Sequence, residues 1–231
     1  MKKLFLIAFL FCLKSFGQNI DYKNYASFLK KYVTNSGNVN YDKIKINKSE
    51  LESIADQLTD TKPTDKWSKN EKMAYYINVY NVFTIKSIVD NYPVKSIKDI
   101  TNVWEKKIIP QGKVLYSLSE IENKILRKMD DPRIHFAINC ASFSCPKLEN
   151  EVYIADKLDK QLDAGAKEFI NDKSKNLITA SEIKLSNIFD WYSSDFKNDG
   201  SIIDYLNKYS NTKIEKKAKT RFLDYNWSLN K

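Results

Sequence analysis

The sequence has few of the side chains that carry imidazole or thiol chemistry. Its 231 residues include one histidine, His135, and three cysteines, Cys12, Cys140 and Cys145. Three of these four lie within residues 133–146, so imidazole or thiol chemistry must begin there. Glycine and proline number only five each, and the chain shows no repeat, low-complexity tract or long linker.

Arginine is also scarce, although the chain is basic. Lys and Arg together number 38 and the formal net charge is +9, yet the only arginines are Arg127, Arg133 and Arg221. Nucleic-acid-binding surfaces usually depend on arginine for bidentate contacts with bases and phosphates. A solvated, lysine-rich surface explains the excess charge better. We therefore expect no nucleic-acid partner.

The first 17 residues have the pattern of a secretory signal peptide. Lys2 and Lys3 precede an apolar run over residues 4–13, and Ser15 and Gly17 place small side chains at the two positions that a signal peptidase reads. The run is too short for a membrane span. We expect export, to the periplasm or out of the cell, with Gln18 as the first mature residue and no stable membrane span after cleavage.

Cleavage would leave 214 residues with a formal net charge of about +6, because three lysines are lost with the signal peptide. A chain of this length suits one well-cored domain or two small ones. The simpler prediction is a single domain over residues 18–231. It would keep two cysteines, Cys140 and Cys145, and an even count in an oxidising compartment first suggests a disulfide.

Apolar spacing predicts a helix-dominated chain with short strands. Three capping-box patterns, at Ser49, Ser68 and Ser117, each place a glutamate three residues after a serine. The predicted helices cover residues 22–32, 49–58, 68–91, 117–129 and 158–169. The predicted strands cover residues 107–109, 114–116, 177–179, 183–185 and 223–229. We therefore predict an α+β fold, a helix-dominated single domain with a small, largely antiparallel sheet.

The stretch around the histidine has the two-residue period of a strand. Apolar and polar side chains alternate over residues 133–139, which would point His135 and Asn139 the same way. A strand rises roughly 3.3 Å per residue, so the thiol of Cys140 would lie about 16 Å from the imidazole, on the opposite face. A direct Cys–His pair therefore requires a sharp turn at Asn139 or Cys140, and the small residues over 141–144 would permit one.

Three polar side chains occupy predicted apolar faces. Asn78 and Asn81 share a face of the helix over 68–91 with apolar neighbours, so their amides must be hydrogen-bonded. They either fix a neighbouring loop or line a site. Glu122 lies on the apolar stripe of the next helix, where a carboxylate is paired, perturbed or functional. Its candidate partners are Arg127, Arg133 and His135.

Four segments, in this order, resemble the family called domain of unknown function 547. The resemblance covers roughly residues 70–200, and the segments that carry it are YINVYN (76–81), LSEIENKILR (118–127), residues 131–146 and residues 189–196. It implies a common fold and a shared site without an established reaction. Tyr76 departs from the family, in which tryptophan or phenylalanine is common.

The resemblance also bears on individual residues. It places Asn78, Asn81, Glu122, Arg133 and His135 at positions that belong to the family's motifs. It further implies that cysteine is kept at the position of Cys140 in many members, whereas the position of Cys145 can be serine. A disulfide between these two positions is therefore less expected as a shared feature of the family, although this chain could still form one.

These residues give a first hypothesis, a thiol-dependent hydrolase or acyl-transfer enzyme without a cofactor. Its catalytic residues would be Cys140 as nucleophile, His135 as base and Glu122 as orienting carboxylate. Substrate-binding or oxyanion groups would come from Asn78, Asn81, Arg133 and Asn139. The substrate itself is not identified by the sequence.

Two alternatives remain open. In the first, the chain is a non-catalytic exported binding module in which Cys140 and Cys145 form a disulfide. In the second, His135, Cys140 and Cys145 bind a metal ion, since three ligands suit catalytic zinc. Their spacing matches no familiar zinc pattern, so we expect no metal.

Overall fold

The computed structural model describes residues 20–61, 63–198 and 200–231. The predicted signal peptide, residues 1–17, lies outside the described residues. The fold is α+β and dominated by helix, as predicted. The elements, in chain order, are α1 (Lys23–Tyr32), α2 (Tyr41–Ile46), α3 (Lys48–Asp60), α4 (Lys69–Asn91), η1 (Ile97–Asp99), β1 (Ile109–Gln111), β2 (Val114–Tyr116), α5 (Leu118–Glu120), η2 (Ile121–Leu126), η3 (Arg127–Met129), η4 (Pro132–Phe136), η5 (Ala155–Lys157), α6 (Leu158–Asn171), β3 (Leu177–Ile178), β4 (Glu182–Leu185), α7 (Ile188–Trp191), α8 (Ser193–Phe196), α9 (Ile202–Leu206) and β5 (Lys219–Phe222).

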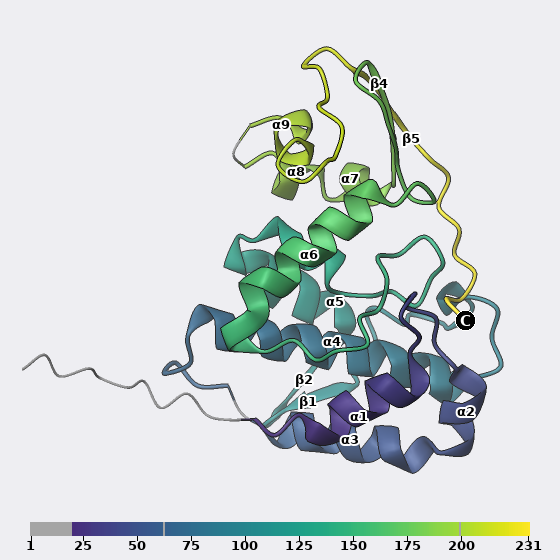
Figure 1. Cartoon of the computed structure of the whole chain (residues 1–231). Coiled ribbons are helices and arrows are strands. Elements are labelled where there is room, and N and C mark those ends of the chain that lie inside the picture. The colour runs from purple at the N-terminus through teal and green to yellow at the C-terminus, as the bar shows by residue number, and fades with distance from the viewer. Residues whose placement is uncertain (1–19, 62, 199) are drawn as a thin grey trace, which may run out of the picture.

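The long helix α4 forms the centre of the larger core. A capping box fixes its start: the Ser68 N–H donates to Glu71 Oε2 at 2.7 Å, and the Glu71 N–H donates to Ser68 Oγ at 3.2 Å. It ends before Pro93, which cannot continue a helix. The helices α1 and α3 lie on one side of α4 and α6 on the other (Figure 1). Side chains on nearly every face of α4 are therefore buried.

A second, smaller core is built from aromatic rings. The ring of Phe136, from η4, lies 5.2 Å from Phe169 of α6 and 5.7 Å from Phe196 of α8, measured between centroids. The ring of Phe189, from α7, completes the group at 4.9 Å from Phe196. This cluster attaches α7 and α8 to the segment that carries the single histidine.

The two predicted hairpins are confirmed. β1 pairs antiparallel with β2, and β3 pairs antiparallel with β4. The last strand was predicted over residues 223–229, but β5 covers Lys219–Phe222 and pairs parallel with β4. Residues beyond it make only isolated bridges, Ser228 to Ser96 and Leu229 to Ser142. The C-terminal segment therefore runs from the three-stranded sheet back to the loop after His135.

The strand predicted over residues 133–139 was wrong, because Pro132–Phe136 forms the 3-10 helix η4. Asp131 caps this turn by accepting the Arg133 N–H at 3.1 Å, and Pro132 supplies the fixed φ that suits a first helical position. The alternation misled because both faces of the segment are buried: His135 is as inaccessible as its apolar neighbours.

Two predicted helix details also need correction. Helix α3 begins at Lys48 after Asn47, and no side chain caps it, so the pattern at Ser49 is not a capping box. The capping box at Ser117 is confirmed, but the regular α-helix after it lasts only for Leu118–Glu120. Ile121–Leu126 then follow as a π-helix, a form that often marks functional positions.

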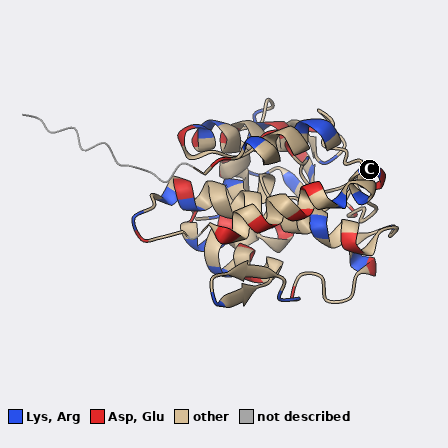
Figure 2. Cartoon of the chain, turned by 90° about the horizontal axis from the view of Figure 1, so that it is seen from below, with Lys and Arg blue, Asp and Glu red and all other residues tan. Residues whose placement is uncertain are grey.

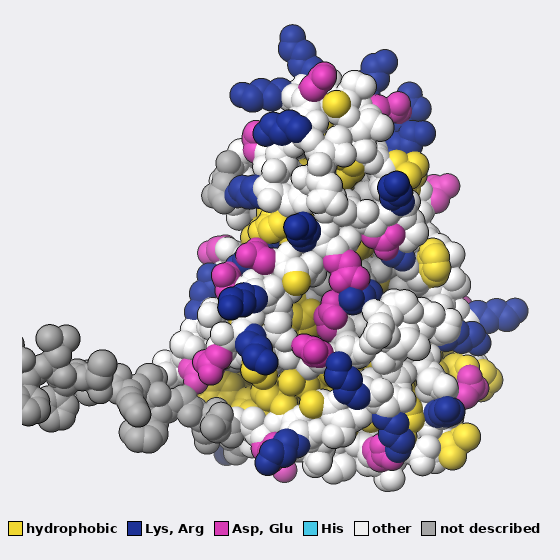
Figure 3. All heavy atoms as spheres, in the orientation of Figure 1, with side chains coloured by type: hydrophobic (Ala, Val, Ile, Leu, Met, Phe, Trp, Pro, Cys, Tyr) yellow, Lys and Arg dark blue, Asp and Glu magenta, His cyan; other side chains and the backbone are white. Residues whose placement is uncertain are grey.

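Acidic and basic side chains alternate over the surface. In the view of Figure 2, Lys or Arg and Asp or Glu are interspersed along the same helices. Figure 3 shows the same mixture on the face seen in Figure 1, with lysine and arginine side chains projecting at its upper end. Within the described residues, no helix has both the length and the apolar character needed to cross a membrane.

Candidate functional site

Buried amides hold the loop that presents Cys140. Asn81 of α4 donates from Nδ2 to the Ala137 carbonyl at 3.0 Å and accepts the Asn139 N–H at 2.8 Å. The Asn139 amide in turn bonds to the Pro146 carbonyl at 2.7 Å and accepts the Ala141 N–H at 2.7 Å. Ala141 has a φ of +56°, which L-residues rarely adopt. The loop is therefore fixed from both ends in a strained turn.

Cys140 Sγ lies among three hydrogen-bonding groups. It is 2.8 Å from Cys145 Sγ, 3.0 Å from Ser142 Oγ and 3.2 Å from the Tyr225 hydroxyl. The backbone N–H of Cys140 donates to Cys145 Sγ at 2.9 Å. Both cysteines are free thiols.

This environment stabilises a thiolate at Cys140. Burial alone would raise the pKa, but hydrogen bonds from Cys145, Ser142 and Tyr225 outweigh it and lower the pKa of the Cys140 thiol to about 7. The pKa of Cys145 moves the opposite way, because it is buried and bonded to the Cys140 sulfur. Burial and the nearby sulfur charges likewise raise the pKa of Tyr225. Both neighbours therefore stay protonated and can donate.

His135 is held by a carboxylate from α8. Its Nε2 lies 2.8 Å from Asp195 Oδ2, and its ring stacks on Tyr192 with 4.0 Å between centroids. Arg127 donates two hydrogen bonds to the same carboxylate, from Nε at 2.7 Å and from Nη2 at 2.8 Å. Burial would raise the pKa of Asp195, but His135 and Arg127 hold it well below its usual range. Asp195 is therefore ionised, and its Oδ2 accepts a hydrogen bond from the Nε2–H of His135.

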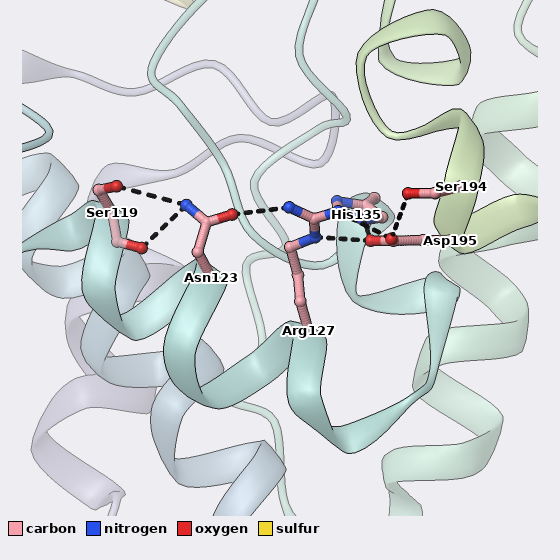
Figure 4. Close-up of polar contacts among 6 residues, drawn as sticks. All are labelled: Ser119, Asn123, Arg127, His135, Ser194 and Asp195. Carbon is pink, nitrogen blue, oxygen red and sulfur yellow. Dashed lines mark hydrogen bonds and ion pairs between the residues drawn. The ribbon is translucent and has the colours of Figure 1, made fainter.

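The network extends along the helix surface toward the pocket. Arg127 Nη1 donates to Asn123 Oδ1 at 2.8 Å, and Asn123 Nδ2 donates to the Ser119 carbonyl at 3.0 Å. Ser194 Oγ adds a bond to Asp195 at 3.0 Å. Figure 4 shows this continuous chain from Ser119 to the imidazole. The orientation of His135 is therefore fixed by Asp195 of α8, which Arg127 of η3 holds in place.

A pocket of about 280 Å³ joins these parts. Cys140, His135 and Glu122 all line it, so the three predicted catalytic residues share one cavity. The rest of the wall is mainly aromatic, formed by Tyr80, Trp104, Trp191, Tyr192, Tyr225 and Trp227. A small apolar cavity with a few convergent polar groups is typical of a ligand site.

The three predicted catalytic residues do not form the hydrogen bonds with one another that the sequence suggested. No hydrogen bond joins Cys140 to His135, although both line the pocket. Nor does Glu122 orient the imidazole, because its Oε2 is bonded instead to the Tyr80 hydroxyl at 3.3 Å. The orienting carboxylate is that of Asp195.

None of the four predicted substrate-binding residues, Asn78, Asn81, Arg133 and Asn139, lines the pocket, and each makes hydrogen bonds or ion pairs within the protein. Asn78 donates to the Tyr153 carbonyl at 2.8 Å and accepts its N–H at 3.1 Å, so its amide fixes a neighbouring loop, as Asn81 and Asn139 also do. Arg133 lies outside the pocket lining and binds carboxylates at Asp131, Asp159 and Asp163.

The metal alternative finds no support in the geometry. Among residues 20–61, 63–198 and 200–231, no group of three or more His, Cys, Asp or Glu side chains is placed to hold a metal ion. His135 Nε2 is engaged by Asp195 at 2.8 Å. The set of His135, Cys140 and Cys145 is therefore not assembled as a ligand cluster.

Sequence reasoning missed Asp195, Tyr192 and Tyr225. Tyr192 and Asp195 lie in the segment 189–196, which the resemblance singled out without giving either residue a role. Tyr225 lies 85 residues after Cys140. The alternation of aromatic residues near the C-terminus was the one available signal, and it indicated a strand.

Comparison with protein families agrees with the resemblance noted above. A family model described as "Protein of unknown function, DUF547" matches residues 64–170. The chain carries a DUF547 domain. No curated protein and no solved structure matches the chain. The DUF547 match contains Glu122, His135 and Cys140, whereas Tyr192, Asp195 and Tyr225 follow it in the chain.

Proposed function

We propose that this DUF547 protein is a thiol-dependent hydrolase or acyl-transfer enzyme with Cys140 as its nucleophile. The observation that carries the proposal is the set of hydrogen bonds around Cys140 Sγ, which lowers the pKa of a thiol at the wall of a pocket. A thiol with a pKa of about 7 is substantially ionised at neutral pH, and the thiolate is the reactive form.

In the proposed reaction the Cys140 thiolate attacks the acyl carbon of an ester, thioester or amide. A C–S bond forms, the bond to the leaving atom breaks, and the leaving group departs with the electron pair and takes up a proton. Water then attacks the thioester, which releases the carboxylic acid and restores the thiolate. An amine or alcohol in place of water gives acyl transfer.

His135 supplies the proton transfers in this proposal. Its Nε2–H is directed to Asp195, so Nδ1 is the ring atom that is free to accept a proton from water and return it to a leaving group. Asp195 is a positioning residue, since it fixes the tautomer and orientation of the imidazole. Stacking against the Tyr192 ring also restricts rotation of the imidazole.

The labelling rate of Cys140 as a function of pH tests the proposal. We expect alkylation by iodoacetamide with a midpoint near pH 7, because the thiolate reacts and its concentration rises through the pKa. Cys140→Ser should remove this fast phase. Cys145→Ala should keep it but move its midpoint upward, since the sulfur loses one donor. Mass spectrometry of tryptic peptides identifies the labelled cysteine.

The binding-module alternative predicts a different labelling result. The two sulfurs lie 2.8 Å apart, so an oxidant that accepts two electrons could join them with release of two protons. If neither cysteine labels until a reductant is added, a disulfide exists and the enzyme proposal fails. If Cys140 labels without reductant but its midpoint is at the ordinary value near 8.5, the activated thiolate is absent.

We also propose that the protein is exported after removal of residues 1–17. The support is the sequence pattern alone, a charged start, an apolar run and small residues before Gln18. Expression of the full chain in a bacterium with a secretion pathway should give a protein whose intact mass corresponds to residues 18–231. Retention of residues 1–17 in the mature protein would contradict export by this route.

A further inference from the structure

Glu122 is a buried carboxylate with an unused oxygen. Its side chain is only 6% exposed and projects from the π-helical turn η2 into the pocket wall. Oε2 accepts from the Tyr80 hydroxyl, whereas Oε1 has no hydrogen-bond donor among the described residues. A buried carboxylate needs donors or a cation to offset its lost hydration. Oε1 itself is fully buried, so it is the Glu122 carboxylate as a whole, in the pocket lining, that lacks a compensating cation.

The charges around the pocket favour a cation beside this carboxylate. The buried carboxylate of Glu122 lines the pocket, the carboxylate of Glu105 is exposed and screened by solvent, and no described lysine or arginine lines it, although the chain carries a net charge of +9. The nearby Arg127 is occupied by its bidentate pair with Asp195. The Glu122 carboxyl group thus forms no ion pair in the described part of the chain.

The aromatic wall supplies a second kind of attraction for a cation. Trp191 and Trp227 stack at 5.7 Å, and Tyr225 lies 4.5 Å from Trp227. The faces of such rings attract ammonium groups, Trp most strongly. The chain's own cations already do this nearby: Lys98 Nζ lies 5.3 Å from the Trp227 ring and the Arg127 guanidinium 5.3 Å from Tyr192.

We propose that the pocket binds a primary alkylammonium group, attracted by the Glu122 carboxylate, with the tryptophan and tyrosine rings surrounding its alkyl chain. A primary ammonium fits better than a quaternary one, because it is smaller and can donate hydrogen bonds to a carboxylate. At about 280 Å³ the cavity is slightly below the usual range for whole small-molecule ligands, roughly 300–1,000 Å³, so it suits one end of a larger molecule.

This inference names the substrate class and in that respect rests on the proposed function. Cys140 lines the same cavity as Glu122. An ammonium held at Glu122 would place the rest of the molecule beside the thiolate. The substrate is then an acyl compound that carries a primary amine, such as one with a lysine-like side chain.

Binding can be tested without turnover in the Cys140→Ser protein. Three of the four tryptophans line the pocket, so their fluorescence reports on occupancy. We expect n-butylammonium to bind at least tenfold more tightly than 1-butanol, its neutral analogue of similar shape. Glu122→Gln, which keeps an acceptor for Tyr80, should abolish that preference. Glu105→Gln, at an exposed carboxylate of the same pocket, should leave it within about twofold.

The outcomes separate this inference from the proposed function. Two results with the protein that retains Glu122 would overturn the ammonium site, whatever the Glu122→Gln variant does. One is equal affinity for n-butylammonium and 1-butanol, and the other is binding of neither. A tenfold preference in a protein whose Cys140 shows no activated thiolate would keep the ammonium site and remove the enzyme. Esters hydrolysed at equal rates with and without an amine would keep the enzyme and remove the ammonium site.

Discussion

Replacement of Cys140 by alanine is expected to abolish the fast release of p-nitrophenol from p-nitrophenyl acetate, lowering its rate by on the order of 10³-fold or more. The unmodified protein should show a burst equal to the enzyme concentration, because acylation of the thiolate releases one p-nitrophenol before the thioester is hydrolysed. Alanine cannot form the C–S bond. Stopped-flow absorbance measures the burst, and intact mass detects the acetyl group.

The matched control for this prediction is Cys145→Ala, which alters the neighbouring sulfur. It removes a donor that lowers the pKa of Cys140 and leaves the nucleophile in place. We expect the burst to persist and its pH midpoint to rise above about 7, so that acylation slows mainly at neutral pH. A burst that survives Cys140→Ala would show that another group is acylated, and it would remove Cys140 from the reaction.

Replacement of Asp195 by alanine is expected to destabilise the protein by about 2 kcal/mol at pH 7, less than a fully buried pair because the ion pair is partly exposed. The change leaves two groups without their acceptor. The Arg127 side chain is 27% exposed, and that of His135 only 1%. Urea-induced unfolding followed by far-UV circular dichroism measures the loss. The same variant should slow thioester hydrolysis, because His135 is no longer oriented.

The effect of Asp195 should depend on pH in a defined direction. His135 and Arg127 lower the pKa of Asp195 in the folded state, so its charge adds stability above the unfolded pKa near 4, and that contribution is lost as the pH falls toward the folded pKa. The difference between the unmodified protein and Asp195→Ala should therefore be full at pH 7 and shrink below about pH 4.

Asp195→Asn serves as the control that separates charge from hydrogen bonding. Asparagine keeps one acceptor oxygen for Arg127 or His135 and loses the charge, so we expect a smaller loss of about 1 kcal/mol at pH 7. An Asp195→Ala protein as stable as the unmodified one would show that the ion pair contributes nothing. A difference that grows below pH 4 would contradict the lowered pKa.

Local chemistry made much of the fold readable in the sequence. The helix that begins after Ser68 and ends before Pro93 was predicted well, since a capping box and a proline act within a few residues. The hairpin at 109–116 followed from its turn and its short flanking strands. The prediction failed at residues 133–139, where an alternating pattern is buried on both faces and therefore carries no information about a strand.

The sequence also located part of the candidate site, again from local features of the chain. Scarcity of histidine and cysteine located Cys140 and His135, and a carboxylate on an apolar stripe located Glu122. Each was a local anomaly in composition or pattern. The partner of His135 was not found, because Asp195 lies 60 residues away and on a different helix. Its contact with the imidazole arises only when α8 packs on the aromatic cluster around Phe136.

The sequence by itself determined the helix-dominated class, the location of the one imidazole and of the two thiols near it, and the helix ends that capping groups define. These depend on interactions between residues that are near one another in the chain. Only the tertiary structure decided that Asp195, and not Glu122, holds His135, and that Tyr225 joins Cys145 and Ser142 around the thiol. The physical reason is that pKa values and hydrogen-bond partners depend on distance in space, which packing sets.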